Sequence, residues 1–363
     1  MARRVLRRIG PDPEELDGRV YWNATVVEFD GRRHVVSHNA ILTLVTVNGC
    51  NAACRFCSNE VTFMATGPFL AWDRRLARVK ELALLAGVTK IAYTGGEPTV
   101  SPARLLDLVA RTAPGFRKAR LHTNGFGLLH PVETPEGPRP LMTALAAHGL
   151  TGISISIAHH DEAVNRAVMR FKSPRFQGLD DDTLRRIAAE DAGRPLARRL
   201  SCVMTRESVA DTRGILDYVA WGRRLGFRRF IFRSPSGIPG EFTKRTEFST
   251  YNHSRHIDID PVTRDLERLP GWVERYRQHK TDSHVHVYQV DGEVTVDVDE
   301  SSEEEDPDEK IRRLNVMPNG VTYTSWIDPC SHLFDDERED ALANAARELP
   351  VLAARRGLAR AAG

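Results

Sequence analysis

The stretch Ile41-Leu-Thr-Leu-Val-Thr-Val-Asn-Gly-Cys50-Asn-Ala-Ala-Cys54-Arg-Phe-Cys57 contains the signal that decides the fold. Its first seven residues are apolar or β-branched, which predicts a buried strand over 41–47. Asn48-Gly49 ends that strand, and three cysteines follow at once. The sequence therefore predicts a strand that delivers three thiols to one loop.

The same pattern of strand then helix continues to about residue 235. Further strands are expected at 88–93, 119–123, 152–157, 199–205 and 227–232, with helices near 73–85, after Ser101-Pro102, and at 140–148, 182–190 and 211–225. Alternating strands and helices predict parallel pairing with right-handed crossovers. We expect an α/β fold, a partial (β/α)6 barrel of parallel strands, although an open doubly wound sheet fits the same pattern.

Ligands of such sheets bind at the carboxyl ends of the strands. Three unusual loops are expected at this edge: the cysteine loop, Gly95-Gly96-Glu97-Pro98 and Thr123-Asn124-Gly125. Their coincidence on one rim predicts the active site there.

The cysteine spacing C-x3-C-x2-C favours an iron–sulfur cluster. Three thiolates leave one iron of a [4Fe–4S] cluster open for another ligand. A tetrahedral zinc site would need a fourth Cys or His nearby, and none lies within about ten residues. An odd total of five cysteines argues against a disulfide framework.

Cys50-x3-Cys54-x2-Cys57 after the first strand, with Phe56 before the last cysteine, resembles the radical S-adenosylmethionine (radical SAM) superfamily. The resemblance spans roughly 41–235. It implies a [4Fe–4S] cluster on the three cysteines, with SAM on the open iron. Reductive cleavage of SAM would then supply a 5′-deoxyadenosyl radical that abstracts a substrate hydrogen.

The resemblance also implies residues that contact SAM. Gly95, Gly96 and Glu97 match the family's Gly-Gly-Glu motif, with Glu97 accepting a hydrogen bond from the methionyl amine. Phe56 is expected to hold the adenine. Weaker candidates near the cofactor follow from position on their strands: Ser156, Ser201 and Arg233.

The nearest branch contains the molybdenum-cofactor cyclase and peptide-modifying enzymes, but the chain departs from both. The cyclase carries a second, C-terminal three-cysteine cluster, whereas only Cys330 lies in that region here. It also has an arginine at the position of Ala92. We therefore expect a single-cluster enzyme without an auxiliary-cluster domain, and not the GTP cyclase reaction.

Other residues could serve the substrate. Cys330 could return a hydrogen atom to a substrate radical, or be an ordinary half-buried cysteine. Thr123, Asn124, His159 and His160 are candidate substrate contacts at the rim, although Asp161 could simply cap the next helix there. His284-Val-His286 is expected to be a pair of surface histidines, because no further zinc ligands can be identified. The basic residues Arg166, Arg170 and Lys172 could bind a substrate carboxylate or phosphate, or form a solvated helix face.

Three segments are expected: an N-terminal β-hairpin extension (1–40), the core (41–235), and a loop-rich C-terminal α+β extension (236–363) that covers the mouth of the barrel. The C-terminal segment is predicted to contain hairpins at 285–298 and 314–326, an acidic solvated loop at 299–309 and a last helix at 336–360.

Composition excludes several classes. The 363 residues include 51 basic and 49 acidic ones, a net charge of +2 that gives no nucleic-acid footprint. No apolar run approaches a membrane span, and no secretory signal follows the basic N-terminus. We expect a cytoplasmic enzyme that acts on a small polar metabolite (sugar, amino acid or nucleoside), served by a flavodoxin- or ferredoxin-type reductant. The alternatives are a ribosomally made peptide, an RNA substrate, or a non-catalytic iron–sulfur or zinc scaffold.

Overall fold

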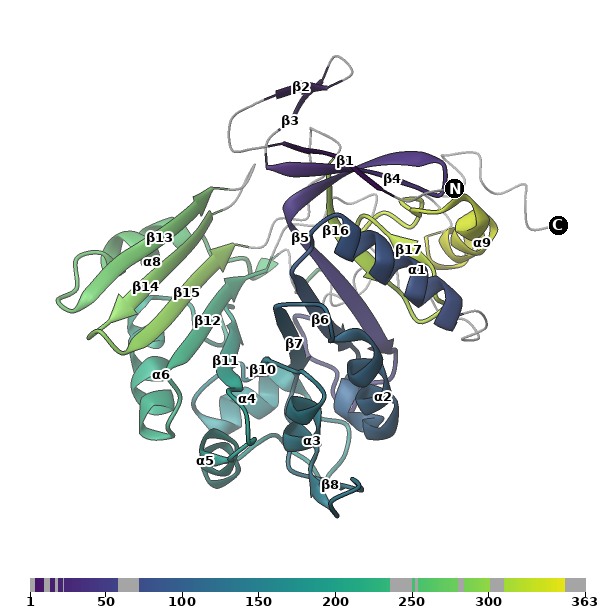
Figure 1. The fold of residues 1–363 in the computed structure, drawn as a ribbon. Helices are drawn as coiled ribbons and strands as arrows, with labels where there is room; N and C mark the ends of the chain where they lie inside the picture. The colour runs from purple at the N-terminus through teal and green to yellow at the C-terminus, as the bar shows by residue number, and fades with distance from the viewer. Residues whose placement is uncertain are drawn as a thin grey trace.

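The computed structural model describes residues 4–9, 14–16, 19–21, 23–57, 72–235, 250–251, 254–279, 284–300 and 310–349. Within these residues one mixed sheet of thirteen strands organises the molecule (Figure 1). Its order is β1-β4-β5-β6-β7-β10-β11-β12-β15-β14-β13, with β16 on β5 and β17 on β16.

The parallel centre of this sheet confirms the predicted α/β fold. Its strands are β5 (Arg32–Val47), β6 (Lys90–Gly95), β7 (Lys118–Thr123), β10 (Gly152–Ser156), β11 (Ala197–Val203) and β12 (Arg229–Ser234). The helices between them are α1 (Trp72–Leu85), α2 (Pro102–Thr112), α3 (Leu141–Ala147), α4 (Glu162–Met169), α5 (Asp181–Ala189) and α6 (Thr212–Arg224). Short elements complete the loops: η2 (Pro98–Val100), β8 (Pro131–Val132) and β9 (Arg139–Pro140).

Strand periodicity decides which side chains meet the helices. Leu121, Ile155 and Leu200 are fully buried in the main core, while their neighbours in sequence point to the opposite face. Helix starts follow from aspartate caps: Asp180 accepts from the Thr183 N–H at 2.7 Å, and Asp211 from the Gly214 N–H at 2.8 Å.

The N-terminal hairpin is continuous with the core. β4 (Ala24–Phe29) pairs antiparallel with the first half of β5, and the second half of β5 is the first parallel strand. The expected separate strands at 32–37 and 41–47 are therefore one, since no Gly or Pro interrupts them. The expected strand 19–29 is instead divided at Asn23, whose φ is +45°. Two further short elements precede it: β1 (Arg4–Ile9), which pairs with β4, and β2 (Glu14–Leu16), which pairs with β3 (Arg19–Tyr21).

The C-terminal part extends the same sheet at both edges. It contains α8 (Ile259–Leu266), β13 (Trp272–His279), β14 (His284–Val290), β15 (Val294–Glu300), β16 (Ile311–Val316), β17 (Thr322–Tyr323), η4 (Asp335–Glu337) and α9 (Arg338–Glu348). β15 lies parallel to β12, and β16 lies parallel to β5. The expected hairpins are present, but the sequence did not predict these parallel pairings. The domain division at 40 and 235 stays a prediction.

The acidic run begins inside a strand. Residues 299 and 300 belong to β15, and Asp299 is buried, which corrects the expectation of a solvated loop at that end. Residues 301–309 lie outside the described part of the chain.

None of the described helices is long and apolar enough to cross a membrane.

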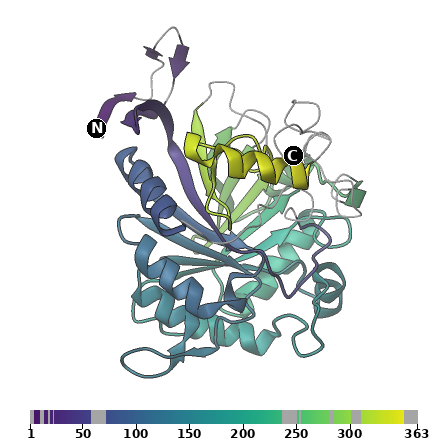
Figure 2. The same cartoon turned by 90° about the vertical axis from the view of Figure 1, so that its right-hand side faces the viewer.

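The first parallel strand is covered on both faces (Figure 2). Leu42 and Leu44 of β5 pack in the main core that includes α1. Val45, on the other face, packs in a second cluster with Ala341 of α9 and with Tyr323. In Figure 2, α1 (blue) and α9 (yellow) accordingly lie on opposite sides of β5.

A buried carboxyl group connects α9 to the sheet. Glu337 is fully buried, and its Oε2 accepts a hydrogen bond from the Thr322 N–H at 2.7 Å. Arg75 Nε lies 3.9 Å from its Oε1. Burial raises the pKa of Glu337 from 4.5 to about 7, against the opposing effects of the Thr322 hydrogen bond and Arg75.

This pKa predicts a pH-dependent stability. Between pH 4.5 and about 7 the folded state holds the Glu337 proton more tightly than the unfolded chain, so stability falls as pH rises through that window. Glu337→Gln removes this loss. From pH 4.5 to 7.5 the wild type should therefore lose up to about 3 kcal/mol of unfolding free energy relative to the variant.

Urea unfolding followed by circular dichroism at several pH values measures this difference. Glu339→Gln, at an exposed position in the first turn of α9, is the matched control. A Glu337→Gln difference that stays constant with pH would contradict the assignment.

Candidate active site

The cysteine loop leaves the carboxyl end of β5 and brings three thiols close together. Cys50, Cys54 and Cys57 are each partly exposed. The Cys57 N–H donates to the Cys54 carbonyl at 3.0 Å, and the Ala52 N–H points at Cys50 Sγ at 3.4 Å. Burial raises the pKa of the Cys54 thiol well above its usual value, and the neighbouring thiols of Cys57 and Cys50 raise it further.

A segment about 115 residues further along the chain holds this loop in place. The Ala53 N–H donates to the Arg170 carbonyl at 3.0 Å, and the Arg55 N–H to the Val168 carbonyl at 3.1 Å. The Lys172 N–H donates to the Asn51 carbonyl at 2.8 Å. The end of α4 therefore pairs with the cysteine loop much as a neighbouring strand would.

Lys172 and its neighbours also supply side chains to the loop. Lys172 Nζ donates to the Cys50 carbonyl at 3.2 Å. Met169 Sδ lies 3.7 Å from Cys54 Sγ, and Phe56 packs against the apolar cluster around Met169. Residues 170 and 172, for which the sequence left open an anion site or a solvated helix face, thus contact the cysteine loop.

The Gly-Gly-Glu turn lies directly on the start of the cysteine loop. The Gly96 N–H donates to the Val47 carbonyl at 2.8 Å, and the Glu97 N–H to the Gly49 carbonyl at 2.9 Å. Gly95 has φ +132°, and a Cβ there would overlap the Val47 carbonyl oxygen. A Cβ on Gly96 would overlap the Gly49 carbonyl. Both positions require glycine because the backbone of the turn lies so close to the backbone of residues 47–49. This requirement holds independently of any contact with SAM.

Gly96→Ala should therefore destabilise the protein by about 1–3 kcal/mol, because the Gly49 backbone has to move. Urea unfolding measures the change. Gly49→Ala is the matched control in the same contact, since a Cβ there meets nothing within 4 Å, and it should stay within about 0.5 kcal/mol of the wild type. Equal losses in both variants would contradict the steric explanation.

Glu97 is the most heavily hydrogen-bonded side chain of the site. It is 1% exposed, and its Oε1 accepts from the Thr99 N–H at 2.9 Å, from the Thr99 hydroxyl at 2.5 Å and from the Thr123 hydroxyl at 2.6 Å. Its Oε2 accepts from the Asn124 N–H at 2.6 Å. Burial raises the pKa of Glu97, while these donors lower it. The carboxylate thus joins the ends of β6 and β7.

The network continues from β7 to the cysteine loop. Asn124 Nδ2 donates to Asn51 Oδ1 at 2.7 Å, and Asn124 Oδ1 accepts from the Phe126 N–H at 3.1 Å. Asn51 lies between Cys50 and Cys54 in sequence. Thr123 and Asn124, expected as substrate contacts, are both buried and participate in this network. Their role toward substrate stays a prediction.

Glu97→Gln should cost about 2–3 kcal/mol of unfolding free energy, because both carboxylate oxygens face donors and an amide NH2 would meet one of them. Urea unfolding is the measurement. Glu162→Gln, an exposed residue with only a 3.8 Å pair to Arg166, is the matched control and should change stability by less than about 0.5 kcal/mol. A Glu97→Gln loss no larger than the control's would show that the carboxylate is not needed.

The remaining candidates for SAM contact lie on neighbouring strands. Ser156 and Ser201 are partners in the register of β10 and β11, and both are partly exposed. Arg233 Nη2 and Nε donate to Asp299 Oδ2 of β15 at 2.8 and 3.0 Å. The sequence did not predict this pairing of Arg233 with Asp299.

The other predicted residues are placed as follows. His159 and His160 stack with ring centroids 4.3 Å apart, directly before Asp161, which caps α4. Burial lowers the pKa of His159. Cys330 lies in the loop after β17, where its N–H donates to Asp328 Oδ1 at 2.8 Å. Whether Cys330 donates hydrogen stays a prediction.

The sequence reasoning missed a set of charges on the inner face of the sheet, the face opposite the helices. Arg120 and His122 on β7 alternate with core residues, as do Arg199 on β11 and Asp297 on β15. Strands buried on both faces are usually continuous apolar runs. Charged residues inside these strands could therefore have indicated a polar inner face from the sequence alone.

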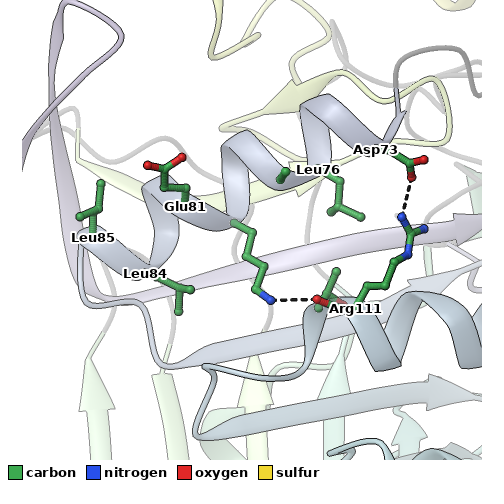
Figure 3. Close-up of a pocket in the computed structure, with 9 residues that line it drawn as sticks. Asp73, Leu76, Glu81, Leu84, Leu85 and Arg111 are labelled. Atoms are coloured by element: carbon green, nitrogen blue, oxygen red, sulfur yellow. Dashed lines mark hydrogen bonds and ion pairs between the residues drawn. The ribbon is translucent and has the colours of Figure 1, made fainter. Parts of the chain in front are cut away.

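A cavity of about 580 Å3 lies elsewhere, between α1 and α2 (Figure 3). Leu76, Leu84 and Leu85 line it, and the Asp73–Arg111 ion pair of 2.6 Å closes one end. It contains none of the predicted site residues, so we assign it no part in the chemistry.

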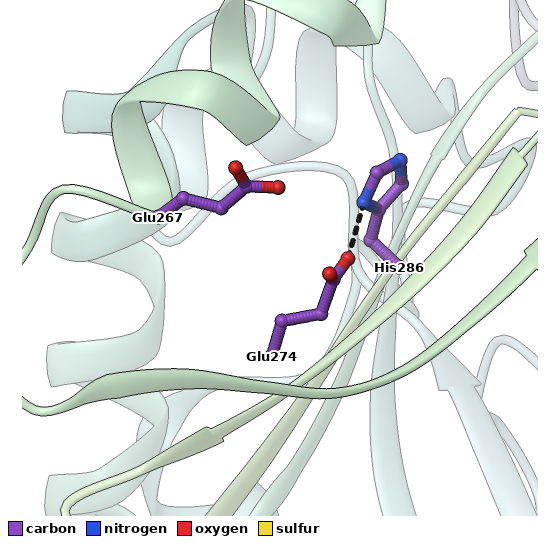
Figure 4. A group of neighbouring side chains, drawn as sticks. All are labelled: Glu267, Glu274 and His286. Carbon is purple, nitrogen blue, oxygen red and sulfur yellow. Dashed lines mark hydrogen bonds and ion pairs between the residues drawn. The ribbon is translucent and has the colours of Figure 1, made fainter.

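A second group of possible metal ligands is already neutralised (Figure 4). His286 Nδ1 lies 2.7 Å from Glu274 Oε1, with Glu267 nearby. Arg277 pairs with both carboxylates, at 2.6 Å from Glu267 and 2.9 Å from Glu274. The guanidinium thus compensates the charge of both carboxylates.

Comparison with known proteins gives a family match over this part of the chain. The radical SAM superfamily profile matches residues 44–188, which contain the cysteine loop, the Gly-Gly-Glu turn and Glu97 with its partners. Residues 44–188 are thus similar to the radical SAM superfamily. Members of that superfamily use a [4Fe–4S] cluster and SAM.

Among curated relatives, GTP 3′,8-cyclase 1 of Pseudomonas aeruginosa is 29% identical over 60% of this chain and 63% of its own length. GTP 3′,8-cyclase of Stenotrophomonas maltophilia is 29% identical over 65% of this chain and 64% of its own length. The chain thus spans slightly less than two thirds of these relatives. Among solved structures, SuiB of Streptococcus suis bound to S-adenosylmethionine covers 91% of this chain and 68% of its own, with 15% identity and a TM-score of 0.48.

The cysteine loop fits the cluster on the chemistry of its donors. The three thiols are on one short loop, partly exposed, and close enough to raise the pKa of Cys54. Thiolates are the ligands that iron–sulfur clusters take. These three cysteines would hold three irons and leave the fourth for SAM.

Proposed function

We propose that the chain cleaves SAM reductively and uses the resulting radical to abstract hydrogen from a small polar metabolite: a sugar, an amino acid or a nucleoside. The observation that carries the proposal is the position of the three thiols, on one loop beside the Gly-Gly-Glu turn at the carboxyl end of β5. When bound, the cluster and SAM supply the 5′-deoxyadenosyl radical.

This chain's own residues bind and orient the cofactors. Cys50, Cys54 and Cys57 would ligate the cluster, and the backbone pairing to 168–172 would hold their loop rigid. SAM would lie against the following residues: Phe56, Gly95, Gly96, Glu97, Ser156, Ser201 and Arg233. Because the Glu97 carboxylate already accepts four hydrogen bonds, we expect its main effect on SAM to come from orienting the turn.

The cyclase reaction named for the relatives is not our proposal for this chain. Ala92 stands where we expect an arginine in the cyclase, and Cys330 is the single cysteine after Cys202. The similarity to the cyclases supports a small substrate of related size. A low-potential cluster also needs a one-electron donor, for which we propose a flavodoxin- or ferredoxin-type protein in the reducing cytoplasm.

The test uses anaerobically purified protein with a reconstituted cluster, dithionite and SAM, and no other substrate. We expect 5′-deoxyadenosine, measured by mass spectrometry, from the wild type and none from the Cys50/Cys54/Cys57→Ala triple variant. The triple variant should also lack the brown chromophore of the cluster.

A cluster-loaded wild type that forms no 5′-deoxyadenosine needs a second measurement. A change in the EPR spectrum of the reduced cluster on adding SAM would show that SAM binds and that cleavage awaits substrate. An unchanged spectrum together with no product would overturn the proposal in favour of a scaffold.

A further inference from the structure

Three guanidinium groups gather on the inner face of the sheet. Arg120 comes from β7, Arg199 from β11 and Arg233 from β12, strands that lie side by side with β10 between the first two (Figure 1). Arg199 is 13% exposed in its side chain, and Arg120 is partly buried. His122 lies on the same face, two residues after Arg120.

The carboxylates that face these arginines do not balance them. Asp299 is engaged by Arg233 in two hydrogen bonds. Asp297 Oδ2 lies 3.9 Å from Arg199 Nη1, beyond hydrogen-bond distance, and Arg199 Nε instead donates to Ser154 Oγ at 2.9 Å. Three arginines thus face two aspartates.

Arg120 has the least compensation. Among the residues that the structure describes, no hydrogen-bond acceptor or carboxylate within 4.0 Å pairs with its guanidinium, and Asp297 acts on it only at longer range. Gly152 lies opposite Arg120 in the register, and a Cβ there would come within 3.6 Å of Arg120 Nε. Arg229, exposed on β12, adds a further positive charge.

Burial and mutual repulsion oppose the positive charge of these side chains. Burial, then Arg120 and Arg233, lower the pKa of Arg199 to about 9. Burial and Arg199 lower the pKa of His122 well below its usual value. A buried cation without a partner is destabilising, whereas a carboxylate or phosphate can accept paired hydrogen bonds from a guanidinium.

The register places this arginine group beneath the expected SAM site. His122 and Arg199 both lie opposite Ser154, and Ser156 and Ser201 form the corresponding pair two residues nearer the rim. Two residues along a strand are roughly 6.6 Å. A ligand held at Arg199 would therefore extend toward Ser156 and Ser201.

We propose that Arg120 and Arg199, with Ser154 and His122 beside them, form a binding site for an oxyanion, the carboxylate or phosphate group of the substrate. This assignment rests on the proposed function, because it takes the inner face of the sheet as the substrate chamber. It narrows the substrate to an anionic metabolite bound by its charged end.

The test is calorimetric titration of the reconstituted wild type with inorganic phosphate and, separately, with acetate, in chloride buffer. We expect at least one of these anions to bind, and Arg120→Gln and Arg199→Gln each to weaken binding at least tenfold. Binding of phosphate alone would indicate a phosphorylated substrate, and binding of acetate alone a carboxylate. Arg185→Gln, on the outer surface of α5, is the matched control and should bind as the wild type does.

Folding of each variant is checked by its unfolding midpoint and cluster chromophore, and Arg199→Lys, which keeps the charge, should retain part of the binding. Absence of binding by the wild type to both anions, or unchanged binding by folded Arg199→Gln, overturns the proposal. Formation of 5′-deoxyadenosine is measured on the same preparation. Cleavage of SAM without anion binding refutes this site alone, whereas anion binding by a protein that neither cleaves nor binds SAM refutes the proposed function.

Discussion

The carboxylate of Glu97 is the interaction on which the rest of the site depends. It takes four donors from Thr99, Thr123 and Asn124 in a position that water does not reach. A buried carboxylate is costly unless its oxygens are satisfied, and these oxygens are. The ends of β6 and β7 are consequently held at one separation, and Asn124 transmits that constraint to Asn51 in the cysteine loop.

Two glycines allow the turn that contains Glu97 to lie directly against the cysteine loop. Gly95 and Gly96 let the turn after β6 rest on the backbone of 47–49, so that the Glu97 N–H reaches the Gly49 carbonyl. The other side of the cysteine loop is held by backbone pairing to 168–172. The three thiols therefore sit on a loop fixed from both sides, which would reduce the entropy cost of binding a cluster.

Much of the fold was predictable because its signals are local. The six core strands and the helices between them follow from apolar periodicity, and the cap Asp161 follows from residue type. The parallel addition of β15 to β12 and of β16 to β5 was not predictable. A hairpin signal shows which two strands are neighbours in sequence, but carries no information about which sheet edge receives them.

The sequence by itself determined the chemistry that is available: three thiols at a fixed spacing, two glycines where a side chain would not fit, and an acidic residue after them. Tertiary structure alone decided which groups these residues meet. Arg233 meets Asp299, 66 residues away, and Arg199 meets Ser154, 45 residues away. The physical reason is that strand periodicity selects the face of a side chain, whereas the order of strands in the sheet selects its neighbours across that face.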